Sequence, residues 1–288
     1  MKVFVAGSEG QLGRTLADTL PGGVDLTGGN LPGLDITDLA ALEARFAAGR
    51  PDVVVNAAAY TAVDKAESEP GIAAQVNVDG ARNVAQAARA AGARVIHLST
   101  DFVFDGSKGT PYTPADAPAP VSVYGQTKLG GEIAVREASA GDAIIIRTAW
   151  LYSRHGHNFV KTMLRLMAER DTVSVVADQR GTPTWAGSLA AVIWAAIDRD
   201  LPGGIYHWTD GGEASWFEFA AAICREGRAA GLLERDVAVR PIPTAEYPAP
   251  ARRPAYSVLD CAATVAALGI EQHPWATCLQ RMLAEMRD

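Results

Sequence analysis

Cysteine and long apolar runs are scarce in this chain, and each scarcity excludes a class of protein. Only three cysteines occur among the 288 residues, Cys224, Cys261 and Cys278, and none belongs to a CxxC pair. An odd number of widely spaced cysteines predicts neither a disulfide framework nor a zinc site. No apolar run approaches the roughly 18 residues that a membrane span needs. We therefore expect buried, reduced cysteines and no membrane association.

Positive charge is scarce as well. Lysine and arginine total 26 against 33 aspartates and glutamates, which gives a net charge of −7, and the basic residues are scattered along the chain. A nucleic-acid partner is typically met by a basic stripe, so none is expected here. The opening segment, residues 1–6, continues into a glycine-rich loop without the long apolar region of a secretory signal. We expect a cytoplasmic protein that holds any anionic ligand with local donors.

Short apolar segments alternate with longer helical patterns over the first 150 residues. Apolar segments buried on both faces and separated by helices predict right-handed crossovers, and hence an α/β fold with a Rossmann-like, doubly wound parallel sheet. Beyond residue 150, prolines and glycines interrupt this rhythm. We predict an NAD(P)-binding domain of residues 1–150 to which residues 185–210 return. A smaller α/β substrate-binding region would comprise residues 151–184 and 211–288.

The glycine-rich loop Gly7-Ser-Glu-Gly-Gln-Leu-Gly13 follows an apolar segment and opens a helical pattern. In that context the missing side chains let the backbone approach a pyrophosphate, beside which Gln11 and Leu12 would lie. A tight turn without a ligand is the plainer alternative. The predicted second strand, residues 24–30, contains no arginine to meet the 2′-phosphate of NADP. It holds one acid, Asp25, of unknown direction, so the choice between NADPH and NADH stays open.

Three further segments lie where predicted strands give way to loops. Asp35 and Ile36 could meet an adenine edge, although Asp35 is equally plausible as a turn or capping residue. In Asn56-Ala-Ala-Ala-Tyr-Thr61 the small residues would let a dinucleotide pass close to the backbone. In Leu98-Ser-Thr-Asp101 a threonine and an aspartate follow a strand and would face the ligand crevice, unless the threonine only caps a turn.

Tyr124 and Lys128 are four residues apart, which places both side chains on one face of a helix. A nearby ammonium favours phenolate, so this spacing predicts a tyrosine whose pKa is lowered from about 10 and which transfers protons near neutral pH. Alone, the spacing is weak, because an exposed pair of this kind is worth only about 0.2 to 0.5 kcal/mol.

Five motifs in a fixed order give the pair its context: GxxGQLG, NAAAYTAVDKAE, STDFVFDG, YGQTKLGGE and RTAWLYS. Together they resemble the extended short-chain dehydrogenase/reductase group, and within it the dTDP-4-dehydrorhamnose reductases. Asn158, the segment from Asp178 to Thr184 and Arg253 continue the match over nearly the whole chain. The resemblance implies NADPH-dependent reduction, with NADH possible, of the C4 ketone of dTDP-4-dehydro-6-deoxy-L-mannose. The product would be dTDP-L-rhamnose, a precursor of cell-wall polysaccharide.

The resemblance also implies roles for individual residues. Tyr124 would donate a proton to the C4 oxygen, Lys128 would bind the nicotinamide ribose, and Thr100 would bond the same oxygen. The cofactor would be held by Gly7, Gly10, Gln11, Leu12, Gly13, Asp35, Ile36, Ala58, Ala59, Tyr60, Thr61, Leu98, Tyr124 and Lys128. The substrate would be held by Thr100, Asp101, Trp150, Asn158, Gln179 and Arg253, although Arg252 competes with its neighbour for the diphosphate and Trp150 could be an ordinary buried aromatic.

Three features depart from this pattern. Phe102 stands where the family commonly has tyrosine, which removes a hydroxyl beside the pocket. Some relatives are described with Mg²⁺, but Arg14 and Thr15 stand where an acidic ligand would help, so no metal is expected. His155 and His157 do not share a helix face and are expected to be solvated.

Several alternatives remain open. A non-catalytic, NADP-binding regulatory subunit resembling the methionine adenosyltransferase β subunit would have the same fold, but it would not need the intact Thr100, Tyr124 and Lys128. A reductase of another nucleotide 4-keto-deoxysugar, an epimerase and a dehydratase are further possibilities. A dehydratase would want an acid at the position of Phe102. The sequence is compatible with a monomer or a homodimer.

Overall fold

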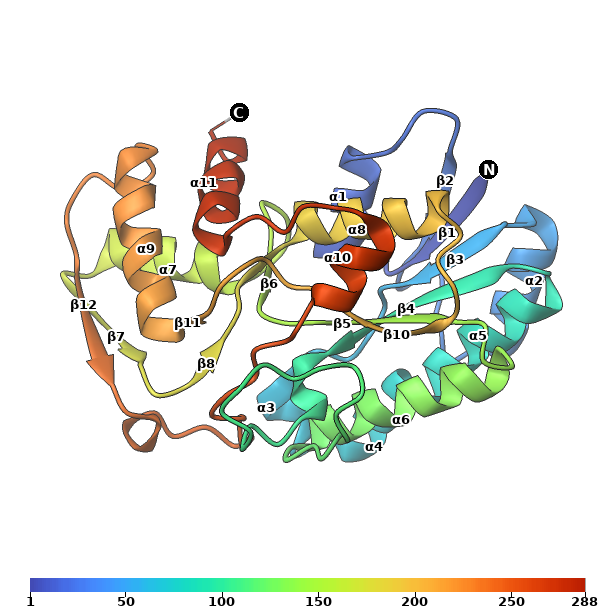
Figure 1. The fold of residues 1–288 in the computed structure, drawn as a ribbon, viewed down its shortest axis with the longest axis horizontal. Coiled ribbons are helices and arrows are strands. Elements are labelled where there is room, and N and C mark those ends of the chain that lie inside the picture. Colours follow the sequence, from blue (N-terminus) through green and yellow to red (C-terminus); the bar gives the residue numbers. More distant parts are fainter. Residues whose placement is uncertain (288) are drawn as a thin grey trace.

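A six-stranded parallel sheet forms the larger part of the molecule in the computed structural model, which describes residues 1–287. The strand order is β10-β5-β4-β3-β1-β2, and every neighbouring pair is parallel (Figure 1). From β1 the chain moves to β2 on one side of β1, and from β2 it crosses to β3 on the other side. The β1–β3 junction is therefore the switch point, which is where open sheets bind ligands. The predicted doubly wound fold is confirmed. The strands are β1 (Lys2–Ala6), β2 (Asp25–Gly29), β3 (Val53–Asn56), β4 (Arg94–Thr100), β5 (Ile144–Thr148) and β10 (Gly204–His207).

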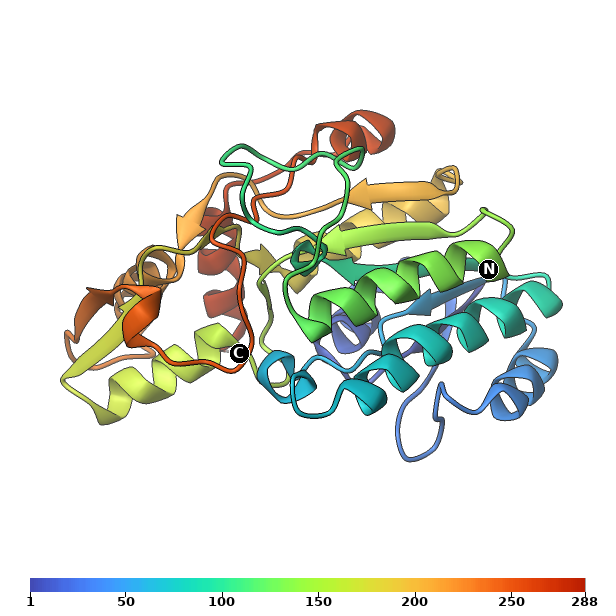
Figure 2. The ribbon, with the colours of Figure 1, turned by 90° about the horizontal axis from the view of Figure 1, so that it is seen from below.

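Helices cover both faces of this sheet (Figures 1 and 2). Successive residues of a strand point to opposite faces, so Val3 and Val5 join one core with α1 and α8, whereas Phe4 joins another with α2 and α5. Asp38 caps α2 by accepting a hydrogen bond from the Ala41 amide at 3.0 Å. The helices of the two faces are α1 (Gln11–Asp18), α8 (Ala186–Asp198) and α10 (Ala262–Leu268), and α2 (Leu39–Gly49), α5 (Ala81–Ala90) and α6 (Val123–Ala138).

The helical run between β3 and β4 is not uniform. After α3 (Val63–Ala66), the run consists of α4 (Pro70–Ala74), a π-helical segment η1 (Gln75–Gly80) and α5. Asn77 of that segment is buried and bonds both the backbone of Tyr60 and the hydroxyl of Thr127 on α6. The π-helical segment therefore links the loop after β3 to the helix that carries Tyr124 and Lys128. No helix within residues 1–287 combines the length and apolar character needed to cross a membrane.

A smaller region packs beside the carboxyl edge of the sheet, at the left of Figure 1. Its core gathers Tyr152, Met167, Phe219 and Leu279 from segments far apart in the sequence. Residues 262–268, which the sequence division places in this region, instead form α10 and pack against β10 and α8 of the main sheet. The elements of the smaller region are β6 (Leu151–Tyr152), α7 (Phe159–Glu169), β7 (Thr172–Val176), β8 (Arg180–Gly181), β9 (Thr184–Trp185), β11 (Ala214–Ser215), α9 (Trp216–Ala229), β12 (Ala238–Ile242) and α11 (Trp275–Glu285). The chain also contains the short 3₁₀ helices η2 (Asp101–Val103) and η3 (Thr244–Glu246).

Candidate active site

A cavity of about 780 Å³ lies between the carboxyl edge of the sheet and the smaller region. Loops after β1, β2, β3 and β4 form one wall together with α6, and residues 149–151 and 156–158, Trp216 and Arg253 contribute the other side. Segments separated by more than two hundred residues thus meet at one site. The predicted residues that line it are Gly7, Gly10, Gln11, Leu12, Gly13, Asp35, Ile36, Ala58, Ala59, Thr61, Leu98, Thr100, Asp101, Tyr124, Lys128, Trp150, Asn158 and Arg253.

The glycine-rich loop is shaped so that only glycine fits at key positions. Gly7 has a φ of +84°, and a Cβ there would lie 2.8 Å from the Ala58 nitrogen. A Cβ at Gly13 would lie 2.4 Å from the carbonyl oxygen of Gly7. Gly10 stands at the N-cap of α1 and has no side chain to cap the first turn. Backbone amides at an uncapped helix N-terminus suit a pyrophosphate, so these residues fit a dinucleotide cofactor.

The far end of the cavity lies beside the end of β2. Asp25 is the first residue of that strand and pairs in register with Lys2, so it lies at the opposite edge from the ligand crevice. Asn30 follows the strand and lines the cavity. Arg45 of α2 donates a hydrogen bond to the carbonyl oxygen of Gly28 at 3.3 Å. Arg45 is thus a basic residue near this strand end, although it does not itself line the cavity.

Asp35 is a turn residue that also lines the cavity. Its carboxylate accepts hydrogen bonds from the backbone and the hydroxyl of Thr37, each at 2.9 Å, as a turn residue does. The same residue, with Ile36, lines the cavity. A turn contact and a place at the ligand site are thus compatible.

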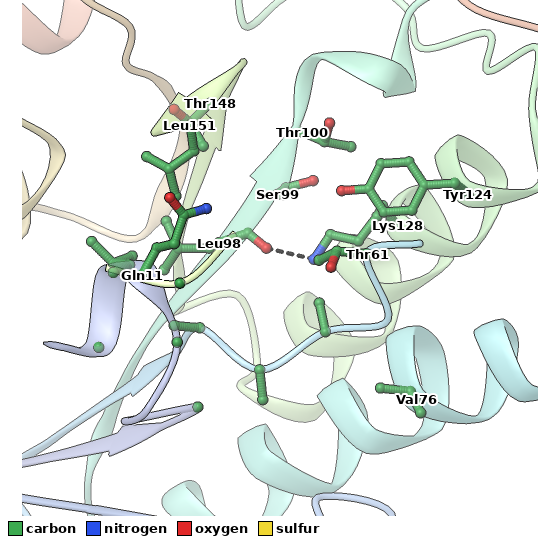
Figure 3. A pocket seen from close by; sticks show the side chains of 18 of the residues that line it. Gln11, Thr61, Val76, Leu98, Ser99, Thr100, Tyr124, Lys128, Thr148 and Leu151 are labelled. Carbon is green, nitrogen blue, oxygen red and sulfur yellow. Dashed lines mark hydrogen bonds between the residues drawn. The ribbon is translucent and has the colours of Figure 1, made fainter. Parts of the chain in front are cut away.

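Tyr124 and Lys128 project from α6 toward the end of β4, as Figure 3 shows. Ser122 caps this helix by accepting a hydrogen bond from the amide of Gly125 at 3.2 Å. The Lys128 ammonium donates to the carbonyl oxygen of Leu98 at 2.6 Å. Thr100 lies at the same strand end and also accepts a hydrogen bond from the Phe102 amide, so it caps the turn as well as facing the cavity.

The pKa of Tyr124 differs from the value that its spacing from Lys128 predicted. Burial raises the pKa of this phenol to about 12, the charge of Asp101 also raises it, and a hydrogen bond with Thr100 opposes the rise. Burial lowers the pKa of Lys128 to about 8, against the opposing charge of Glu132. The predicted lowering of the tyrosine pKa is wrong here because desolvation outweighs the charge that helical spacing supplies. Tyr124 is a neutral phenol that holds its proton at pH 7.

Asp101 is buried beside these groups. One carboxylate oxygen accepts a hydrogen bond from Thr100 at 3.1 Å, while the other has no partner within residues 1–287. Burial raises the pKa of this carboxyl to about 6, against the hydrogen bonds from Ser257 and Thr100. A buried oxygen left unpaired is costly, so this one suits a hydroxyl group of a ligand.

Two tryptophans form the apolar part of the opposite wall. The rings of Trp150 and Trp216 stack with centroids 3.5 Å apart and planes inclined by 8°. Gly181 packs under Trp150, where a Cβ would lie 2.6 Å from the indole. Trp150 is thus not an ordinary core aromatic but part of a flat surface that borders the cavity. Trp216 was not predicted, because it follows a segment that bears none of the five motifs.

Asn158 and Arg253 reach the cavity while bonded to other residues. Asn158 caps α7 through the Lys161 amide and donates to the Gln11 side chain at 3.0 Å, which ties the smaller region to the glycine-rich loop. Arg253 forms a bidentate ion pair with Asp64 of α3 at 2.7 and 3.0 Å. Its neighbour Arg252 is exposed.

Two of the predicted site residues, Gln179 and Tyr60, do not line the cavity. Gln179 is buried and donates to the hydroxyl of Thr244 at 3.0 Å. Tyr60 donates its hydroxyl to Glu69 at 2.8 Å. His155 lies 2.6 Å from a carboxylate oxygen of Asp18, contrary to the expectation for a loop histidine. His157 is exposed at the cavity, where the sequence assigned it no role.

This geometry can be compared with known proteins. The family model described as RmlD substrate binding domain matches residues 1–288. The chain belongs to the RmlD substrate binding domain family. A dTDP-4-dehydrorhamnose reductase of Burkholderia thailandensis is 43% identical over 303 residues, covering 99% of this chain and 100% of the relative. A reductase of the same name from Streptomyces griseus is 48% identical over 263 residues, covering 89% and 84%.

Solved structures agree with the RmlD relationship. A dTDP-4-dehydrorhamnose reductase from Clostridium acetobutylicum superposes with a TM-score of 0.93 at 40% identity, over the whole of both chains. The enzyme of the same name from Bacillus anthracis, in complex with NADP, gives a TM-score of 0.92 at 39% identity over 99% of each chain. The resemblance inferred from the five motifs is therefore confirmed.

Proposed function

We propose that this protein is an NADPH-dependent dTDP-4-dehydrorhamnose reductase that converts dTDP-4-dehydro-6-deoxy-L-mannose to dTDP-L-rhamnose. The observation that carries the proposal is the meeting of Thr100, Tyr124 and Lys128 on the wall of a cavity that the glycine-rich loop also lines. The full-length relationship to reductases of that name supports it. The reaction completes dTDP-rhamnose biosynthesis.

The cofactor would lie along the carboxyl edge of the sheet. The loop from Gly7 to Gly13 and the amides of α1 would hold its pyrophosphate, and Lys128 would hold the nicotinamide ribose. When bound, NADPH supplies the hydride. Arg45 of α2 would have to exchange the carbonyl oxygen of Gly28 for phosphate oxygens to meet a 2′-phosphate, and its planar fork can bind two such oxygens.

Tyr124 supplies the proton that reduction of a ketone requires. A phenol with a pKa of about 12 is a weak acid, yet an alkoxide is a stronger base than phenolate, so the proton moves as charge develops on the C4 oxygen. Thr100 would donate a hydrogen bond to the same oxygen by turning its hydroxyl proton away from Asp101. The Lys128 ammonium stabilises the phenolate that remains. Proton transfer thus follows the developing charge and does not need a tyrosine ionised in advance.

The substrate would be held between the two regions of the chain. Residues 1–150 with 185–210 would form the cofactor-binding domain, and residues 151–184 and 211–288, apart from α10, the sugar-binding region. Asp101 would accept a sugar hydroxyl, the Trp150 and Trp216 surface would pack against the sugar, and Asn158 would orient the loop beside it. Arg253 would bind the diphosphate after exchanging Asp64 for phosphate oxygens. We further propose a cytoplasmic location and a monomer or homodimer.

One assay tests the function. The 4-keto sugar is supplied to the purified protein, the loss of reduced-cofactor absorbance is followed with NADPH and separately with NADH, and the product sugar is identified. We expect turnover to dTDP-L-rhamnose, faster with NADPH. Binding of NADP without turnover of this sugar or related 4-keto sugars would instead identify a non-catalytic subunit. Turnover to a different sugar would move the chain to another reductase of nucleotide 4-keto-deoxysugars.

A further inference from the structure

A buried ion pair lies next to the catalytic groups, and no step of the reaction uses it so far. Glu132 of α6 and Arg147 of β5 have side chains that are 2% and 1% exposed. The Arg147 guanidinium donates to both carboxylate oxygens, from Nε at 2.8 Å and from Nη2 at 2.7 Å. Two charges withdrawn from water are often no more stabilising than apolar side chains of the same size. Stability alone is therefore a poor explanation for this pair.

Glu132 and Lys128 both form hydrogen bonds with strand β4. Glu132 follows Lys128 by four residues, so their side chains lie on one face of α6. Lys128 donates to the carbonyl oxygen of Leu98, and Glu132 accepts from the hydroxyl of Ser99, so adjacent residues of β4 bond adjacent turns of the helix. Arg147 is the register partner of Ser99 in β5. Glu132 thereby fixes the rotation of α6 against two strands.

Among the titratable groups near Lys128, Glu132 is the one whose negative charge acts on the lysine. From β4, His97 is buried, and burial holds its pKa well below the usual range, so it is neutral. Tyr124, on the same helix, is neutral as well, and Asp101 faces the phenol. Glu132 is the acid whose charge raises the pKa of Lys128, against the lowering caused by burial. Its carboxylate is itself held in place by Arg147.

We propose that Glu132, held by Arg147, is a positioning residue for the reductase: it directs Lys128 into the cavity and keeps the ammonium charged there. The inference rests on the proposed function, since contact with the cofactor ribose is what makes the orientation and charge of Lys128 useful. Without Glu132, a buried lysine beside a neutral histidine would release its proton more readily.

The test is Glu132→Gln, which keeps the shape of the side chain and removes its charge. NADPH affinity is measured by fluorescence titration across pH without the sugar, and kcat is measured across the same range with it. NADPH affinity and kcat should both fall at alkaline pH as Lys128 loses its proton. In the variant we expect this fall to occur about one pH unit lower, because a nearby opposite charge has been removed. The matched control is Glu137→Gln, an exposed carboxylate on the same helix, which should keep the wild-type profile. A purely structural pair would reduce stability or amplitude without moving either profile.

A second variant covers the case in which Arg147, left without its partner, prevents folding. Glu132→Gln with Arg147→Gln removes both charges and lets the two amides bond each other, and the alkaline shift should persist. A folded single or double variant with the wild-type pH dependence of NADPH binding overturns the inference. If the wild-type protein binds NADPH but does not reduce the sugar, the proposed function fails, whereas the binding titrations still decide the role of Glu132.

Discussion

The two walls of the cavity are built in different ways. The sheet wall consists of consecutive short segments at strand ends, so that Thr100, Asp101 and the residues of the glycine-rich loop are positioned by their own strands. The wall from the smaller region consists of side chains held by distant partners, as Trp150 is by Trp216 and Arg253 is by Asp64. Under the proposed function, the proton transfer would take place at the sheet wall, and the wall from the smaller region would select the sugar nucleotide. Substitutions on the first wall should reduce kcat, and those on the second should raise KM.

The largest effect is expected on the sheet wall. Tyr124→Phe removes the proton donor, and we expect kcat to fall by about 10² to 10⁴-fold, the usual contribution of a general acid. NADPH affinity, measured by fluorescence titration, should be nearly unchanged. Tyr247→Phe, at a tyrosine that is 55% exposed, is the matched control. A Tyr124→Phe variant that keeps most of its activity would remove Tyr124 from this role.

Substitutions in the wall from the smaller region should raise KM for the sugar substrate. Arg253→Ala removes the guanidinium proposed to bind the diphosphate, and we expect KM for the dTDP sugar to rise about 10 to 100-fold, the range of hydrogen bonds to charged groups. The KM for NADPH should not change. Arg252→Ala, at the exposed neighbouring arginine, should have little effect on steady-state kinetics. A larger effect at Arg252 would reverse the assignment of these two residues.

The pH dependence of turnover tests the sheet wall again. Lys128 has a pKa of about 8, lowered by burial, and its protonated form is the active one. Activity should therefore be retained below pH 8 and be lost above it, by about tenfold per pH unit once the lysine is deprotonated. The measurement is kcat/KM for the sugar against pH, which reports the free enzyme. A flat profile to pH 10 would show that the charge of Lys128 is not needed.

The smallest effect is expected at the cofactor end of the sheet wall. Arg45→Ala should raise KM for NADPH by about fivefold to tenfold while leaving NADH unaffected, because an exposed guanidinium gives only a modest gain to a phosphate contact. The two KM values are compared in one assay, with Arg50→Ala at the C-cap of α2 as the control. Equal changes for NADH and NADPH would mean that Arg45 does not contact the 2′-phosphate.

Features that depend on local sequence were predictable, and features that depend on packing between distant segments were not. The alternation of strands and helices over the first 150 residues and the glycine-rich loop are local patterns, and both are present in the structure. The π-helical segment at Asn77 was not recovered, because it depends on contacts with Tyr60 and Thr127. Trp216 was not found for the same reason. Its place at the site is set by the packing of elements that are distant in sequence.

The sequence by itself determined the doubly wound sheet and the residues at the strand ends, because those depend on short-range periodicity and on the common carboxyl edge of parallel strands. The family was identified separately, from the resemblance of five ordered motifs. Tertiary structure alone decided the protonation of the site. Spacing on one helix predicted a tyrosine made more acidic by Lys128, but burial raises its pKa and lowers that of the lysine. Desolvation depends on every atom packed around a group, and no helical spacing encodes it.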